Sequence, residues 1–166
     1  MGSGKTTVGR ELAALLGRPL IDNDDQIGAT TGATVADISV TAGVAEMRRL
    51  ESAALAQALA SPVPAVITAA AGVVLDARDR RRLQGPFVVW LHAEPATLSA
   101  RIRRDPARPF LGSDPQTVLR TMEEQRRSLY ADVADLVIDV DELAPRQVAA
   151  AIVGEIRKLS DGLPGR

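Results

Sequence analysis

The sequence predicts one α/β domain with a parallel sheet, and two observations support this. Segments whose apolar residues recur at helical spacing alternate with short apolar runs along the chain, the order that builds parallel sheets covered by helices. The first helical segment directly follows Gly2-Ser3-Gly4-Lys5-Thr6, a sequence typical of a phosphate-binding turn. With 166 residues, 46% of them hydrophobic, we expect residues 1–166 to enclose a single core.

In the first half of the chain, glycine and proline mark where the predicted elements end. The first helical pattern stops at Gly17. Gly32 and Gly43 interrupt a mixed segment, and Ser61-Pro62 closes the long helix that follows it. The expected elements are a helix over 5–16, a strand over 19–21, a mixed segment over 24–42, a helix over 44–60 and a strand over 65–68.

In the second half, the clearest strand is the apolar run 87–91, and we expect Trp90 within it to belong to the core. Three prolines and a glycine in 105–115 indicate a mobile loop. Asp114-Pro115 suits the start of the next helix. The other expected elements are helices over 76–84, 94–104, 115 to about 130 and 144–159, a strand over 136–138 and a frayed tail over 160–166.

The composition excludes several classes of function. Cysteine is absent, which rules out disulfides, thiolate catalysis and cysteine-bound zinc. The single histidine, His92, argues against a multi-histidine metal site and a Ser-His-Asp triad, and we expect it to be structural or exposed. A net charge of −1 with 2% aromatic residues gives no footprint for nucleic acid. Without a bilayer-spanning run of ~18–20 apolar residues or a recognisable signal peptide, we expect a cytoplasmic protein that binds no membrane.

The phosphate-binding turn is the most informative motif. Residues 2–6 are the second half of the pattern G-x-x-x-x-G-K-[ST]. Its glycines let backbone N–H groups surround a phosphate, and the following helix adds its positive end. Lys5 would reach the β- and γ-phosphates, and the Thr6 hydroxyl would bind Mg²⁺. The alternative is a chance Gly-Ser-Gly-Lys-Thr before a helix, which the well-placed helix disfavours.

The first glycine of the pattern and the strand that normally feeds it have no counterpart before Met1. One interpretation is that the sequence begins inside a longer gene product, which we favour; the other is that the chain lacks this strand. Either way, we expect four strands, with a gap or poor pairing beside the phosphate loop.

Acidic residues follow the first predicted strand. Ile21 is succeeded by Asp22, Asn23, Asp24 and Asp25. Because ligands bind at the carboxyl ends of parallel strands, we expect Asp22 and Asp24 to be functional and Asp25 to be a surface residue. The plainer alternative is a turn that only caps a helix.

Taken together, these and other short sequences along the chain resemble the shikimate kinase family. The markers occur in family order: GSGKTT, Ile21-Asp22-Asn23-Asp24, Met47-Arg48-Arg49-Leu50-Glu51, Val66-Ile67-Thr68, Arg108-Pro109-Phe110-Leu111 and Arg127-Ser128-Leu129-Tyr130. The resemblance implies a three-layer α/β/α P-loop kinase that has five parallel strands in the family, here with the first, central strand missing. It also implies a monomer without nucleic-acid or membrane partners.

The resemblance implies phosphorylation of a small hydroxy acid by ATP, most directly the 3-hydroxyl of shikimate, with Mg²⁺ as cofactor. It assigns catalysis to Lys5, Asp24 and Arg108, and the metal to Thr6 and, through water, Asp22. It assigns ATP binding to Gly2, Ser3, Gly4, Lys5, Thr6, Thr7, Arg101 and Arg108. It assigns substrate binding to Asp24, Arg48, Ala70 and Arg127.

Particular roles follow from this resemblance. Arg48 and Arg127 would anchor the substrate carboxylate, because a guanidinium pairs with it bidentately. Asp24 would accept the hydroxyl proton, and Arg108 would close over the phosphoryl group from a lid over 102–115. Residues 24–60 would form the acceptor-binding region, where Glu51 could orient Arg48. The plainer alternative for each arginine is a solvated side chain.

The sequence departs from the family at the acceptor pocket. Where the family has three glycines, this chain has Ala69, Ala70 and Ala71, with Gly72 one place later. Ser39 and Met47 stand where the family has phenylalanine. These changes leave open a kinase of another hydroxy acid, such as gluconate, or a nucleotide-binding paralogue without transfer activity. A nucleoside kinase is disfavoured, because residues 25–60 contain no aromatic residue to stack a base.

Overall fold

The structure is a computed structural model and describes residues 2–102 and 114–161. Its helices are α1 (Lys5–Leu16), α2 (Asn23–Thr31), α3 (Val35–Thr41), α4 (Gly43–Leu59), the 3₁₀-helix η1 (Val73–Leu75), α5 (Ala77–Arg82), α6 (Pro95–Ile102), α7 (Pro115–Ala131) and α8 (Pro145–Asp161). Its strands are β1 (Leu20–Asp22), β2 (Val66–Thr68), β3 (Val89–His92) and β4 (Leu136–Asp139).

The strands form two separate parallel pairs. β1 pairs with β2, so that Asp22 lies opposite Thr68. β3 pairs with β4, so that His92 lies opposite Asp139. Within the described residues no ladder joins β2 to β3. The expected gap beside the phosphate loop is therefore confirmed for this part of the chain.

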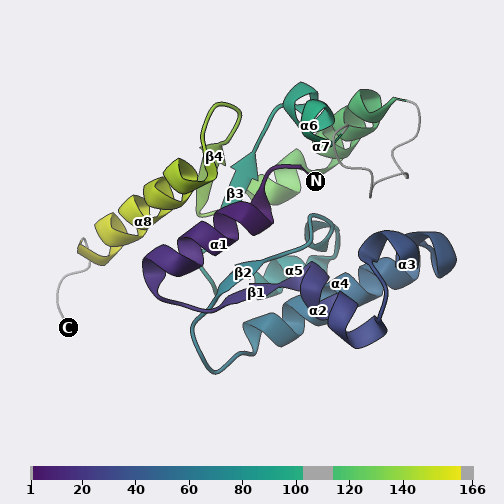
Figure 1. The fold of residues 1–166 in the computed structure, drawn as a ribbon, viewed down its shortest axis with the longest axis horizontal. Helices are drawn as coiled ribbons and strands as arrows, with labels where there is room; N and C mark the ends of the chain where they lie inside the picture. Colours follow the sequence, from purple (N-terminus) through teal and green to yellow (C-terminus); the bar gives the residue numbers. More distant parts are fainter. Residues whose placement is uncertain (1, 103–113, 162–166) are drawn as a thin grey trace.

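Helix α1 lies between the two pairs (Figure 1). It packs against α8 on one side and against β2 on the other. One hydrophobic cluster joins α1, β3, β4 and α8, with Val8, Ala93, Val140, Val148 and Ile152 at its centre. A second cluster joins α4 to the segment after β2 and contains Leu55, Ala70, Val73, Val74 and Leu83. The first cluster holds the pair of β3 and β4 against α1 and α8, and the second packs the segment after β2 against α4.

The contact between α1 and β2 is unusually close. Gly9 faces the side chain of Thr68, and a Cβ atom at position 9 would lie 2.4 Å from Thr68 Cγ2. Glycine therefore lets the helix approach the strand, which brings the start of α1 beside the end of β1.

The predicted order of elements agrees with the structure, with two refinements. The mixed segment 24–42 consists of α2 and α3, separated at Gly32, which adopts a left-handed conformation with φ 71°. The helix expected over 76–84 is α5, preceded by η1, because the Asp76 side chain accepts a hydrogen bond from the Arg78 N–H and starts a new helix there. Most of the predicted lid lies outside the described residues.

No helix in the described ranges is both long and apolar enough to cross a membrane.

Candidate active site

The phosphate loop leads directly into α1. Gly2 and Gly4 have φ angles of 72° and 82°, a left-handed conformation that side chains with a Cβ disfavour. Helix α1 then begins at Lys5 without a side-chain cap. Its first N–H groups therefore have no capping side chain, and such a helix start binds anions. Thr7, the last residue assigned to ATP, is exposed.

Asp22 connects this loop to the two strands beside it. Its Oδ2 atom accepts hydrogen bonds from the hydroxyls of Thr6 at 2.8 Å and Thr68 at 2.7 Å. Its Oδ1 atom accepts one from the backbone N–H of Asp24 at 2.9 Å. Burial alone would raise the pKa of Asp22, but these hydrogen bonds outweigh it and hold the pKa below its ordinary value. The carboxylate is therefore charged at neutral pH.

Arg48 lies on α4 against the turn that follows β2. Its Nη1 atom contacts Glu51 Oε2 at 2.5 Å, and the two side chains are 28% and 7% exposed. A Cβ atom at position 72 would lie 1.4 Å from Arg48 Nη1, so Gly72 is what leaves room for the guanidinium. Glu51 thus orients Arg48, as expected from their shared helix face.

Asp24 and the buried Glu51 are electrostatically coupled. Burial raises the pKa of Glu51, and the negative charge of Asp24 raises it further, whereas Arg48 and Arg126 oppose the rise. Asp24 itself is exposed at the start of α2. The carboxylate of Asp24 therefore lies near enough to Glu51 for its charge to act on it.

Arg126 on α7 is a site residue that the sequence reasoning missed. It is 8% exposed, and its Nε atom is buried without a hydrogen-bond partner among the described residues. Its positive charge opposes the rise in the pKa of Glu51. Burial raises the pKa of Tyr130, and the charges of Arg126 and Arg48 partly oppose that rise as well. Helical spacing could have found it, because position 126 shares a face with the cavity-lining Leu119, Met122, Glu123 and Tyr130.

The structure places two of the predicted arginines away from this group. Arg127 is 57% exposed and its Nη2 atom pairs with Glu123 Oε1 at 2.5 Å. Arg101 donates from Nη2 to the carbonyls of Val140 at 2.8 Å and Asp141 at 3.2 Å, which places it at the loop after β4. The predicted lid residue, Arg108, lies outside the described residues.

The alanine segment after β2 forms an ordinary turn. None of the described residues other than glycine has a positive φ, so Ala69, Ala70 and Ala71 need no left-handed conformation. Ala70 belongs to the hydrophobic cluster around Leu55, so its methyl group packs into the core. The carbonyl of Ala71 accepts a hydrogen bond from the Tyr130 hydroxyl at 2.6 Å, which fixes this turn to α7.

The two positions that differ from the family's phenylalanines lie within residues 24–60, which were predicted to bind the acceptor. Ser39 is partly buried on α3. Met47 on α4 packs against a small cluster of Ile27, Ile38 and Ala54. The methionine therefore fills space between α2, α3 and α4, as its flexible side chain allows.

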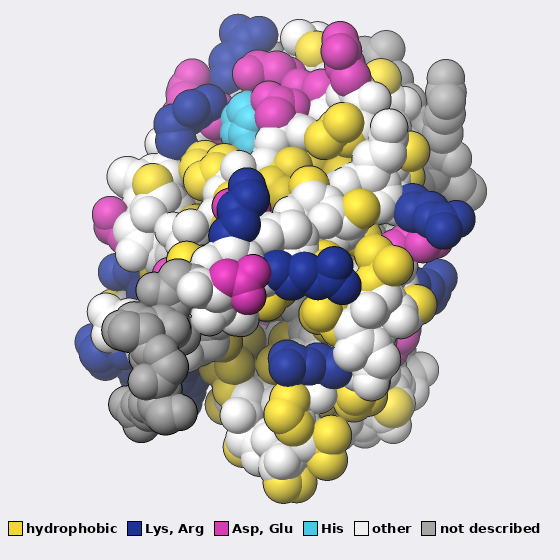
Figure 2. Space-filling model, turned by 90° about the vertical axis from the view of Figure 1, so that its left-hand side faces the viewer, with side chains coloured by type: hydrophobic (Ala, Val, Ile, Leu, Met, Phe, Trp, Pro, Cys, Tyr) yellow, Lys and Arg dark blue, Asp and Glu magenta, His cyan; other side chains and the backbone are white. Residues whose placement is uncertain are grey.

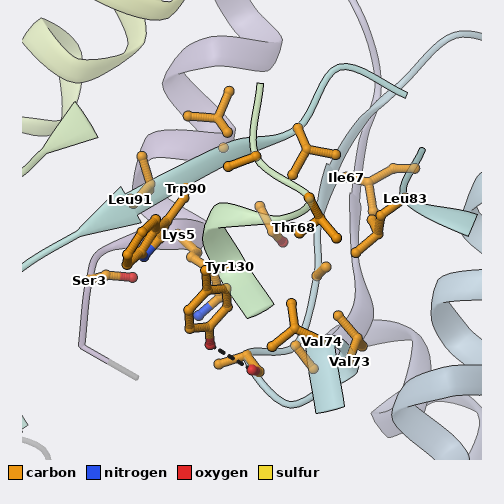
Figure 3. Close-up of a pocket in the computed structure, with 18 of the residues that line it drawn as sticks. Ser3, Lys5, Ile67, Thr68, Val73, Val74, Leu83, Trp90, Leu91 and Tyr130 are labelled. Carbon is orange, nitrogen blue, oxygen red and sulfur yellow. Dashed lines mark hydrogen bonds between the residues drawn. The ribbon is translucent and has the colours of Figure 1, made fainter. Parts of the chain in front are cut away.

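A cavity of about 300 Å³ lies between the two strand pairs. Figure 3 shows Ser3, Lys5, Trp90 and Leu91 on one side of it and Thr68, Val73, Val74 and Leu83 on the other. Trp90 stacks on Tyr130 with ring centroids 5.3 Å apart. Trp90 is thus part of the wall of the cavity that Lys5 also lines.

His92 is surrounded by acidic side chains. Its Nδ1 atom lies 3.4 Å from Asp139 and its Nε2 atom 3.8 Å from Glu123. Figure 2 shows the histidine with acidic side chains beside it. Its side chain is 13% exposed. Its two ion-pair partners, Asp139 and Glu123, are not among the residues that bond to Asp22 or Arg48.

A series of hydrogen bonds, one electrostatic interaction and one ion pair connects four of the predicted site residues, which are Thr6, Asp22, Asp24 and Arg48. Thr6 bonds to Asp22, Asp22 bonds to the backbone of Asp24, and Asp24 acts on Glu51, which pairs with Arg48. Oxygen ligands for a cation lie at one end of this series, and guanidinium groups for an anion lie at the other. A phosphate loop is next to the cation end, so the arrangement suits phosphoryl transfer to an anionic acceptor.

Comparisons with known proteins give one family. The sequence model of shikimate kinase matches residues 1–157. The shikimate kinase of Thermobifida fusca is 38% identical over 96% of this chain and 92% of that protein. The shikimate kinase of Symbiobacterium thermophilum is 41% identical over 95% of this chain and 92% of that protein.

Solved structures give the same result. Shikimate kinase from Acinetobacter baumannii in complex with shikimate superposes with a TM-score of 0.87 at 34% identity, over 99% of this chain and 91% of that one. Shikimate kinase from Bacteroides thetaiotaomicron gives a TM-score of 0.83 at 26% identity, over 97% of this chain and 94% of that one.

Proposed function

The chain belongs to the shikimate kinase family, and from this premise we propose that it transfers the γ-phosphoryl group of ATP to the 3-hydroxyl of shikimate. The observation that carries the proposal is that the buried Arg126, the partly buried Arg48 and Asp24 all act on the same buried carboxylate, Glu51. A nucleotide-binding protein without an acceptor has no need of such a group.

The acceptor's carboxylate would pair with the two guanidinium groups. Arg48 is held in place by Glu51 and by the space over Gly72. Arg126 has an unpartnered buried Nε atom, which a carboxylate oxygen would satisfy. We therefore propose Arg126, rather than the exposed Arg127, as the second anchor. Ala70 would contribute through its backbone and the packing of its turn, since its methyl group lies in the core.

The nucleotide would bind through the loop Gly2–Thr6. Lys5 and the N–H groups at the start of α1 would hold the phosphates, and Arg101 lies at the loop after β4 where a base could pack. Arg108 stays a prediction for closing over the phosphoryl group.

Mg²⁺ fits the oxygen ligands at the end of this loop. The Thr6 hydroxyl and the ionised Asp22 carboxylate lie together, and Mg²⁺ binds through one or two protein oxygens together with phosphates and water. Thr6 would bind the ion directly and Asp22 through water. When bound, the ion supplies positive charge to the β- and γ-phosphate oxygens.

The chemical step needs one proton acceptor. The acceptor hydroxyl oxygen forms a bond to the γ-phosphorus while the bond from that phosphorus to the β,γ-bridging oxygen breaks. The hydroxyl proton passes to Asp24, and ADP leaves with the bond's electron pair. Lys5 offsets the negative charge on the phosphates during transfer.

An ADP-release assay with shikimate and gluconate as separate acceptors tests the proposal. Shikimate-dependent release that is lost in Lys5→Ala, with the 3-phosphate identified by phosphorus NMR, is the expected result. Release with gluconate alone would move the activity to another hydroxy acid. ATP binding without release for either acceptor would reduce the protein to a nucleotide binder.

A further inference from the structure

The side chain of Arg48 covers the turn that follows β2. Gly72 lies in this turn and is buried. A Cβ atom at position 72 would lie 1.4 Å from Arg48 Nη1, 2.3 Å from Arg48 Cζ and 2.7 Å from Glu51 Oε2. Nη1 and Oε2 are the two atoms of the ion pair between Arg48 and Glu51. The guanidinium and its partner carboxylate therefore rest in the space that a side chain at position 72 would fill.

The backbone of the turn does not itself require glycine. Gly72 has φ −89° and ψ −12°, a right-handed conformation that most residues with a Cβ atom adopt in turns. Gly2 and Gly4 of the phosphate loop differ, because their φ angles are positive. What position 72 needs from glycine is therefore the missing side chain, and this need comes from Arg48.

The turn is held in place on both sides of Gly72. The carbonyl of Ala71 accepts a hydrogen bond from the Tyr130 hydroxyl at 2.6 Å. The carbonyl of Gly72 accepts one from the Leu75 N–H at 3.0 Å. The guanidinium of Arg48, in contrast, is the far end of a flexible side chain that is 28% exposed. A methyl group at position 72 would therefore displace the guanidinium and leave the turn where it is.

We propose that Gly72 is a positioning residue for the acceptor's carboxylate and acts on it through Arg48. The missing side chain lets the guanidinium rest on the fixed turn, and Glu51 holds it there through Nη1. A guanidinium has five N–H donors, so a group held in this way keeps donors for a carboxylate of the acceptor. The inference rests on the proposed function, because it takes Arg48 as the anchor of that carboxylate.

Gly72→Ala tests the proposal in the ADP-release assay. The KM for shikimate should rise about tenfold or more, because a displaced charged donor costs that much. The kcat at saturating shikimate and the KM for ATP should stay close to wild type, since only binding of the carboxylate is weakened. Urea denaturation should show that the variant remains folded. Gly85→Ala is the matched control and should change none of these values, because a Cβ there first meets the Arg82 carbonyl, at 3.9 Å.

A double-mutant cycle shows whether the effect passes through Arg48. In an Arg48→Ala background no guanidinium occupies the space over Gly72, so adding Gly72→Ala should lower kcat/KM for shikimate no further. An equal loss in both backgrounds would overturn the proposal, as would an unchanged KM in the single variant.

Calorimetric titration of shikimate into the same four proteins repeats the cycle without turnover. Gly72→Ala should weaken binding in the wild-type background and leave it unchanged in the Arg48→Ala background. A wild type that binds shikimate with this pattern but releases no ADP would contradict the proposed function and support the role of Gly72. Equal weakening in both backgrounds would overturn the role of Gly72, whatever the activity.

Discussion

At the scale of single residues, two adjacent arginines of α7 have different surroundings. Arg126 is buried among Glu51, Tyr130 and the cavity, whereas Arg127 pairs with Glu123 at the surface. Arg126→Ala should raise the KM for shikimate roughly 10- to 100-fold, the equivalent of a lost charge-assisted hydrogen bond. Arg127→Ala is the matched control and should leave KM close to wild type in initial-rate assays. The opposite ranking would return the anchor role to Arg127.

The carboxylates at 24 and 25 form a second matched pair. The charge of Asp24 acts on Glu51, and both Asp24 and Asp25 are exposed in the first turn of α2. Asp24→Asn should lower kcat about 10²- to 10⁴-fold, because the amide cannot accept the hydroxyl proton. Asp25→Asn should leave kcat unchanged when both variants are measured in the ADP-release assay. Comparable losses in both variants would point to general electrostatics and not to proton transfer.

The sequence predicted the types of site residue better than their orientation. Asp22 was predicted from its place at the end of a strand, whereas Arg48 was predicted from the family resemblance, with Glu51 on the same helix face. Arg126 and Arg127 differ by one position, about 100° around a helix, and only the packing of α7 against the cavity separates them. The role of Gly72 was equally hidden, because it depends on a guanidinium from another helix.

At the scale of elements, α1 approaches β2 only because residue 9 has no side chain. Gly9→Ala should destabilise the protein by about 1–3 kcal/mol, the usual range for an overpacked core, since Thr68 Cγ2 occupies the place of the new methyl group. Gly154→Ala on α8 is the control, because a Cβ there meets nothing within 4 Å. It should raise stability by about 0.5–1 kcal/mol. Urea denaturation measures both; a neutral Gly9→Ala would mean that α1 can shift freely.

Element boundaries followed local chemistry closely. Gly17 ends α1 in a left-handed conformation with φ 61°, and Asp114 caps α7 by accepting from the Thr117 N–H, as their residue types predict. The helix expected over 76–84 begins where the Asp76 side chain caps α5. The 3₁₀-helix η1 over Val73–Leu75 was not predicted.

At the scale of the whole molecule, the free energy of unfolding should depend on pH through the ionisation of Asp22. Its pKa is lowered in the folded protein, so its contribution is present above the unfolded pKa and is lost as pH falls through the folded value. The difference in unfolding free energy between wild type and Asp22→Asn should therefore shrink as pH is lowered from 7 to 3. Urea denaturation of both proteins at several pH values measures it.

The contribution of Glu51 to the free energy of unfolding changes with pH in the opposite direction. Its pKa is raised by burial, so its contribution favours the folded state at low pH and is lost as pH rises. Because Glu51 is present in both proteins, its effect cancels in the wild-type difference. A difference that grows on acidification would contradict the role given to the Asp22 hydrogen bonds.

The close contact between Gly9 and Thr68 also limits the order in which this sequence can evolve. Thr68 supplies both the methyl group that blocks position 9 and the hydroxyl that bonds to Asp22. Thr68→Ser removes the first and keeps the second. A lineage that acquires Thr68→Ser can afterwards accept Gly9→Ala, whereas one that acquires Gly9→Ala first passes through a destabilised intermediate. Two neighbouring positions thus have one accessible mutational path between them.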